Sequence, residues 1–162
     1  MNTYNDNIIN LKDYEVFVFT SNLKGFHGAG SAGFASFNEA GNVWRNHGYD
    51  KWPDGKKGVW NIKGVGWGYQ EGEIGKSYAI PTVISAGAKR SFPLEHIRRH
   101  IEVFNSFSKG MSHLHFYIAQ GAGNNLNGYS IEELRKIWFN DIEWDYNVYF
   151  NNEFAPQGLN KV

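Results

Sequence analysis

The chain has 162 residues, of which 41% are hydrophobic and 17% aromatic, and its 16 basic and 16 acidic residues give a formal net charge of +0. This length and composition predict a single soluble domain, residues 1–162, with a buried core. The balanced charge argues against a nucleic-acid partner, because such proteins usually present a basic face. The absence of cysteine excludes disulfides, thiolate metal sites and a cysteine nucleophile.

The first segment, residues 1–13, is polar and rich in asparagine, and it predicts a loosely docked lead-in to the domain. It has neither the basic nor the apolar region of a signal peptide. No apolar run in the chain is long enough to cross a bilayer. We therefore expect a cytoplasmic protein with no membrane partner.

The next segment joins an apolar strand to a glycine-rich turn. Residues 15–19 predict a strand buried on both faces, and a polar Thr-Ser-Asn triplet follows at residues 20–22. The turn begins at Gly25 and opens a predicted helix over residues 28–40. Such a turn can hold a phosphate, because the first N–H groups of a helix have no internal partner and lie at the positive end of its dipole. The glycine spacing matches neither the dinucleotide fingerprint nor the phosphate-binding P-loop, so by itself the motif is weak.

Residues 41–76 form an unusual segment with four tryptophans and many glycines. A structureless loop of this length is uncommon in a compact domain. We expect an ordered insertion with short strands, for example around residues 58–62, that serves as a lid. Glycine alternates with larger residues over 64–72, which suits a close approach of the backbone to a ligand or to another segment.

The second half of the chain predicts strands alternating with helices. A capping-box-like start at Ser130 opens one helix, and Ile97, Ile101 and Phe104 give the other an apolar face. His113 and His115 are expected to alternate on a strand, facing the same side. The expected elements are a strand over 77–82 that Pro81 ends, a helix over 93–108 with Pro93 at its first position, a strand over 113–119, a helix from 130 to about 140, and a strand over 146–150.

This alternation predicts an α/β fold in which helices flank a mixed sheet with parallel pairings. Ligands of such sheets bind beyond the carboxyl ends of the strands. A second glycine turn, residues 121–123, follows the strand at 113–119, as the first turn follows the strand at 15–19. Both turns are therefore expected at the same edge, where they form one site.

The ordered motifs resemble a family of small, uncharacterised phage and bacterial proteins over about residues 15–154. The block at residues 77–82, Ser-Tyr-Ala-Ile-Pro-Thr, is the most specific part of the resemblance. The other motifs are Thr20-Ser21-Asn22-Leu23, Gly25, His27-Gly28-Ala29-Gly30, Ala32, Gly75-Lys76, Gly121, Gly123, Leu126, Gly128-Tyr129 and Asn147-Val148.

The arrangement more distantly resembles macro domains, which bind ADP-ribose and its derivatives. In that family an asparagine follows an early strand, a triple-glycine type of loop opens the first helix, and a later strand leads to a Gly-x-x-Gly-aromatic phosphate loop. The matching residues here are Asn22, Gly28-Ala29-Gly30 and Gly121-Ala122-Gly123 with Gly128-Tyr129. The second loop is longer than in macro domains, and the insertion at 41–76 has no simple counterpart there.

Individual candidate residues each have a structural and a functional interpretation. His27 has three interpretations: loop hydrogen bonds fix it, it contacts the ligand, or it acts as a general base. It is the only candidate catalytic residue. Asn22 holds a ribose hydroxyl or caps its loop, and Trp67 stacks on a base or packs within its loop. The Lys89-Arg90 and Arg98-Arg99 pairs are interpreted first as solvated surface, with a local contribution to anion binding as the alternative.

The predicted ligand-binding residues are Ser21, Asn22, Gly25, His27, Gly28, Ala29, Gly30, Trp67, Gly121, Ala122, Gly123, Gly128 and Tyr129. The two histidines at 113 and 115 lack a third metal ligand. No metal and no cofactor are predicted.

The resemblance implies a protein that binds ADP-ribose or a related nucleotide signalling molecule. If the protein is encoded by a phage, it would sequester a host immune messenger in the host cytoplasm as an anti-defence sponge. No Asp or Glu occurs in residues 16–38, which favours binding over catalysis. The first alternative is a hydrolase that acts on an ADP-ribose conjugate, with His27 or another group activating water. The second is a structural or interaction protein whose glycines form only tight turns; homo-oligomerisation is left open.

Overall fold

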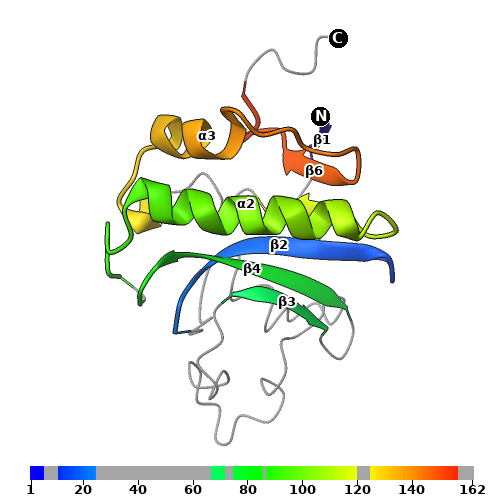
Figure 1. Cartoon of the computed structure of the whole chain (residues 1–162), viewed down its shortest axis with the longest axis horizontal. Coiled ribbons are helices and arrows are strands. Elements are labelled where there is room, and N and C mark those ends of the chain that lie inside the picture. The colour runs from blue at the N-terminus through cyan, green and yellow to red at the C-terminus, as the bar shows by residue number, and fades with distance from the viewer. Residues whose placement is uncertain (6–10, 25–66, 72–74, 86, 120–124, 157–162) are drawn as a thin grey trace, which may run out of the picture.

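The computed structural model describes residues 1–5, 11–24, 67–71, 75–85, 87–119 and 125–156, which form a six-stranded sheet and two helices (Figure 1). This confirms the predicted α/β class. The predicted helix over 28–40, the strand around 58–62 and most of the insertion at 41–76 lie outside the described residues.

The sheet is mixed, with the strand order β1-β6-β5-β2-β4-β3. All neighbouring strands run parallel except β3, which pairs antiparallel with β4 at one edge. The strands are β1 (Asn2–Tyr4), β2 (Glu15–Asn22), β3 (Gly68–Glu71), β4 (Lys76–Val83), β5 (His115–Ile118) and β6 (Val148–Asn151).

The interior strand β2 pairs with β5 on one side and with β4 on the other. Its residues Val16, Phe17, Val18 and Phe19 are at most 4% exposed. Because neighbouring side chains of a strand point to opposite faces, both faces of β2 are covered, as the continuous apolar run predicts. The strand extends past residue 19 and ends at the polar residue Asn22.

The structure differs from the prediction for the first and the last strand of the chain. Residues 1–13 are not simply a loose lead-in, because β1 pairs with β6 in parallel register, Asn2 opposite Tyr149 and Tyr4 opposite Asn151. This pairing joins residues almost a full chain length apart, so no local pattern predicts it. β6 itself begins at Val148 rather than at residue 146.

The prediction that Pro81 ends the second strand is wrong, since β4 continues to Val83. Pro81 lies opposite Ser21 in β2, next to a shift in register between Ser21 and Asn22. Proline lacks a backbone donor, and a strand accommodates it where the regular ladder is interrupted. The expected alternation of His113 and His115 on a strand is also wrong, because β5 begins at His115 and His113 lies in the preceding turn.

Helices α2 (Leu94–Gly110) and α3 (Ile131–Phe139) pack against one face of the sheet. The predicted apolar face of α2 is confirmed, since Ile97, Ile101 and Phe104 are fully buried. Pro93 is the N-cap of α2 rather than its first helical residue. The capping box of α3 is confirmed: the Glu133 backbone N–H donates to Ser130 Oγ (3.1 Å), and the Ser130 N–H donates to Glu133 Oε1 (3.2 Å).

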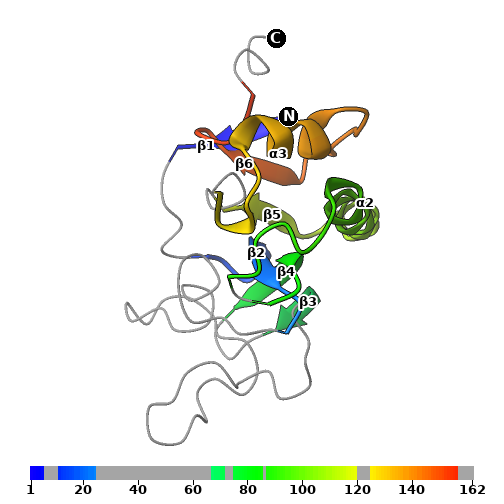
Figure 2. The same cartoon turned by 90° about the vertical axis from the view of Figure 1, so that its left-hand side faces the viewer.

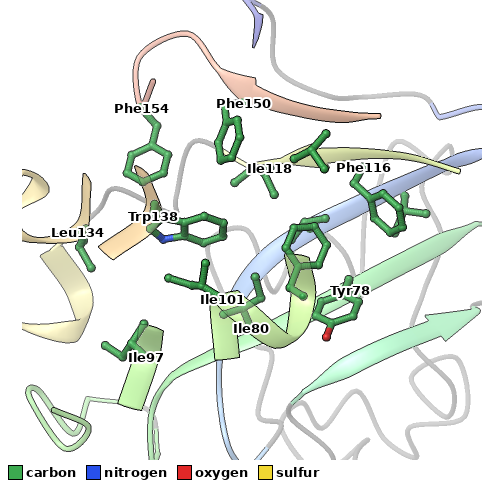
Figure 3. Packing of buried hydrophobic residues seen from close by; sticks show 14 of the residues in the cluster. Tyr78, Ile80, Ile97, Ile101, Phe116, Ile118, Leu134, Trp138, Phe150 and Phe154 are labelled. Carbon is green, nitrogen blue, oxygen red and sulfur yellow. The ribbon is translucent and has the colours of Figure 1, made fainter. Parts of the chain in front are cut away.

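The core lies between the helices and the sheet, and large rings fill it (Figure 3). Trp138 from α3 is 1% exposed and makes edge-to-face contacts with Phe150 and Phe154, whose ring centroids lie 6.0 and 5.9 Å from its own. Its backbone carbonyl accepts a hydrogen bond from Trp144 Nε1 at 2.9 Å. The rings of α3, of β6 and of the residues that follow β6 therefore pack together around Trp138.

Asn147 joins the end of α2 to the start of β5. Its amide nitrogen lies 3.0, 3.3 and 3.1 Å from the carbonyl oxygens of Ser108, Met111 and Leu114, and its side chain is buried. The backbone carbonyl of Asn147 accepts a hydrogen bond from the Phe116 N–H at 2.8 Å. One amide thus donates to carbonyl groups at the end of α2 and in the turn before β5, of which those of Ser108 and Met111 also accept a backbone N–H.

We predict that Asn147→Ala lowers the free energy of unfolding by about 2–4 kcal/mol, because it removes the buried amide whose hydrogen bonds join the end of α2 to the turn before β5. Urea denaturation followed by circular dichroism measures the loss. Asn152→Ala is the matched control, because the Asn152 side chain is exposed, and it should change stability by less than about 0.5 kcal/mol. Equal effects of the two substitutions would contradict a bracing role for Asn147.

Candidate functional site

The candidate site lies at the carboxyl edge of the parallel strands, which Figure 2 shows facing the viewer. At this edge Asn22 of β2 pairs with Val83 of β4, and the Leu23 N–H donates to the Val83 carbonyl at 2.9 Å. On the other side of β2, the Ala119 N–H donates to the Val18 carbonyl at 2.9 Å. The segments that follow β2 and β5 therefore leave the sheet from adjacent strands at the same edge.

The structure places five of the predicted ligand-binding residues. Ser21 and Asn22 are 6% and 7% exposed at the end of β2, and each of them has an interaction partner. The others are Trp67, Gly128 and Tyr129. The predicted residues Gly25, His27, Gly28, Ala29, Gly30, Gly121, Ala122 and Gly123 lie outside the described residues.

Several large apolar side chains near this edge are exposed. Trp67 is 52% exposed and directly precedes β3, whose Gly68 lies opposite Ala79, near the middle of β4. Ile84, directly after β4, is 43% exposed, and Leu126, in the short helix η4 (Asn125–Asn127), is 67% exposed. Exposed apolar groups next to polar ones are typical of ligand sites.

Gly128 and Tyr129 connect two loops that are distant in sequence. Tyr129 is 7% exposed, and its hydroxyl donates to the Phe92 carbonyl at 2.6 Å. Gly128 has a φ of +90°, and a Cβ added there would lie 2.9 Å from Arg90 Cγ and 3.0 Å from Lys89 Cβ. Both residues thus dock the β5–α3 connection onto the β4–α2 connection; their contact with a ligand stays a prediction.

The docking contact includes Arg90, whose contribution is not evident from the sequence. Its backbone N–H donates to the Asn127 carbonyl at 2.7 Å, and its Nε donates to the Gly128 carbonyl at 2.9 Å. The guanidinium carbon lies 4.9 Å from the centre of the Tyr129 ring. The Lys-Arg doublet is visible in the sequence, but its partners follow only from the topology.

The neighbouring basic pair behaves differently. Arg98 is not a solvated surface residue, because its guanidinium group donates to the Ile137 carbonyl at 3.2 Å and pairs with Glu102 Oε1 at 3.2 Å. Its side chain is only 22% exposed. Arg98 therefore joins α2 to the end of α3, while Arg99 is exposed.

The described residues directly after β2, β4 and β5, up to the starts of α2 and α3, carry positive charge only. Residues 16–38, 77–94 and 114–131 contain no Asp or Glu, and their only formally charged residues are Lys24, Lys89 and Arg90. In a chain with a net charge of +0, this is a local excess of cations. Such an excess attracts anions. The carboxylate beside it is Glu133 in the first turn of α3, whose Oε1 lies 3.9 Å from Arg90 Nη2.

His115 lies at the opposite, amino end of the strands. Its Nδ1 lies 3.3 Å from the Tyr149 hydroxyl, and its ring contacts the Tyr14 ring edge-on with centroids 5.2 Å apart. Among the described residues, no group of three or more His, Cys, Asp or Glu side chains has the arrangement of a metal site. No helix in the described part of the chain is both long and apolar enough to span a membrane.

Comparisons with protein-family models, with curated proteins and with solved structures found no match to this chain. The resemblance to macro domains therefore stays a prediction that depends on the ordered motifs.

Three stacked rings lie at the start of α2, beside the docking contact. The rings of Phe92 and His96 stack at 4.5 Å, and His100 stacks on His96 at 5.5 Å. Burial, and to a smaller extent the neighbouring His96, lowers the pKa of His100 below its ordinary value of 6.5.

We predict that this lowered pKa makes the folded protein lose stability as the pH falls below about 6.5. The unfolded chain takes up a proton on His100 at a higher pH than the folded chain does, so acid favours unfolding. Urea midpoints measured from pH 8 to pH 5 should fall less steeply for His100→Gln than for the wild type. His113→Gln is the control at an exposed histidine, and an identical slope for His100→Gln and wild type would contradict the prediction.

A second prediction concerns the close approach at Gly128. Gly128→Ala should cost roughly 1–3 kcal/mol more stability than Gly87→Ala, because both positions have a positive φ but only Gly128 is crowded. A Cβ at Gly87 would meet nothing within 4 Å. Equal losses in urea denaturation would show that the contact with the Lys89-Arg90 segment does not constrain this glycine.

Proposed function

We propose that the protein binds a phosphate-bearing nucleotide derivative, ADP-ribose or a related signalling molecule, at the carboxyl edge of its sheet. The observation that carries this proposal is the charge of that edge. The described residues that directly follow β2, β4 and β5, which are 23–24, 84–85 with 87–93, and 119 with 125–130, include Lys24, Lys89 and Arg90 and contain no Asp or Glu. A pyrophosphate is the part of the ligand that this excess of cations would attract.

The rest of the ligand needs apolar and hydrogen-bonding partners. Trp67 offers an exposed aromatic surface for a base. Asn22 ends β2 at the carboxyl edge of the sheet, where an amide can orient a ribose hydroxyl. The backbone N–H groups of the two glycine turns would hold the phosphates, as the sequence motifs predict.

Binding without cleavage is the better-supported activity. Glu133, a carboxylate in the first turn of α3 that lies 3.9 Å from Arg90 Nη2, is already engaged in the capping box of that helix. Hydrogen bonds from Ser130 hold its pKa below the ordinary value, so it stays ionised and is a poor general acid at neutral pH. Sequestration of a nucleotide messenger requires only tight binding, and a phage protein that does so would remove the messenger from host signalling.

Isothermal titration calorimetry with ADP-ribose, NAD and cyclic ADP-ribose tests the proposal. At least one of them should bind, with an affinity that falls as salt is added, because phosphate contacts are screened by ions. Trp67→Ala should weaken this binding by roughly tenfold, in line with the energy of base–aromatic stacking. Tyr146→Ala is the matched control, because Tyr146 is a 67% exposed aromatic residue that lies just before β6, at the amino end of that strand.

The fate of the ligand separates binding from hydrolysis. Nucleotide recovered after denaturing the complex should be chemically intact when analysed by chromatography and mass spectrometry. A cleaved product would instead support the hydrolase hypothesis. Absence of heat and of any thermal shift with all three nucleotides would contradict the proposal and favour a structural role for the glycine turns.

A further inference from the structure

We propose that Arg90 is the residue that binds the phosphate group of the ligand, through the outer edge of its guanidinium group. This inference rests on the proposed function and goes beyond it by assigning anion recognition to one side chain on the β4–α2 connection. The predicted glycine turns lie on other segments, after β2 and β5.

The backbone of Arg90 is held in an unusual conformation. Its φ is 56°, in the left-handed region that residues with a side chain rarely adopt. The hydrogen bond from its N–H to the Asn127 carbonyl holds this conformation, as does the packing of its Cγ against Gly128. Strained residues of this kind cluster at functional sites, where the surrounding structure holds them in place.

Two contacts hold the side chain of Arg90 in place. Nε donates to the Gly128 carbonyl, and the guanidinium group lies over the Tyr129 ring. The side chain nevertheless remains 61% exposed. An arginine whose plane is already fixed loses little conformational entropy when it binds an anion, and its two Nη groups can donate to two phosphate oxygens.

One carboxylate competes for the guanidinium group. Glu133 Oε1 lies 3.9 Å from Arg90 Nη2, at the limit of an ion pair. Within the part of the chain that the structure describes, Arg90 Nη1 has no partner. The same Glu133 oxygen accepts the Ser130 N–H of the capping box at 3.2 Å, so it is committed to the helix start rather than to Arg90. A phosphate would therefore compete with a weak pair and not with a tight one.

Two substitutions move anion binding in opposite directions. Arg90→Gln removes the donor and should weaken binding of inorganic pyrophosphate and of ADP-ribose by tenfold or more. Glu133→Gln removes the competing charge and should tighten both by about two- to fivefold, since one nearby negative charge is lost. Glutamine at this position still completes a capping box, so α3 keeps its start. Arg99→Gln changes the net charge as Arg90→Gln does, on an exposed position of α2, and should alter neither affinity by more than about twofold.

Calorimetry at low ionic strength with each probe separates the two proposals. Equal affinity of wild type and Arg90→Gln for ADP-ribose would overturn the assignment of Arg90 while the nucleotide function stands. Pyrophosphate binding that depends on Arg90, without binding of ADP-ribose, would support Arg90 and overturn the nucleotide function. No binding of either probe would overturn both. If Arg90→Gln fails to fold by circular dichroism, Glu133→Gln decides, and unchanged pyrophosphate affinity in that variant would overturn the assignment.

Discussion

The pairing of β2 with parallel neighbours on both sides is the constraint on which the rest of the structure depends. It buries four consecutive apolar residues, Val16 to Phe19, and pairs the strand with β4 over residues 16–22 and with β5 over residues 15–18. Because the neighbours are β4 and β5, the connections that follow all three strands leave the same edge. The position of the candidate site is thus a consequence of strand order, and the chemistry of that site depends on which residues the connections contain.

Local patterns predicted the parts of the fold that local forces determine. The capping box of α3 and the apolar face of α2 are confirmed, because each depends on residues within a few positions of one another. The strand β1 and the passage of β4 through Pro81 were not predicted, because both depend on pairing with distant strands. The difference is physical, since helix signals are short-range while strand pairing is decided by tertiary contacts.

The candidate site shows the same division. Gly128 and Tyr129 were expected in a phosphate loop because of the resemblance to macro domains; the structure gives Gly128 a positive φ, and the phosphate contact stays a prediction. The role of Arg90 was not predicted beyond a possible anion contact of a basic doublet, because its partners Asn127 and Gly128 lie on another connection. Charge joins the two levels. The sequence shows which stretches lack Asp and Glu, and the structure places Lys24, Lys89 and Arg90 after parallel strands whose carboxyl ends share one edge of the sheet.

The pairing of β1 with β6 has a consequence for how the protein forms. Asn2 lies opposite Tyr149, so this contact has one of the largest sequence separations that the chain allows. On the ribosome the central strands and α2 emerge well before β6, and the first strand has no partner during that time. Contacts of this kind form late because a long loop must close before they stabilise anything. Until then β6 has an unpaired edge, and a nascent or truncated chain would offer that edge to the first strand of another copy.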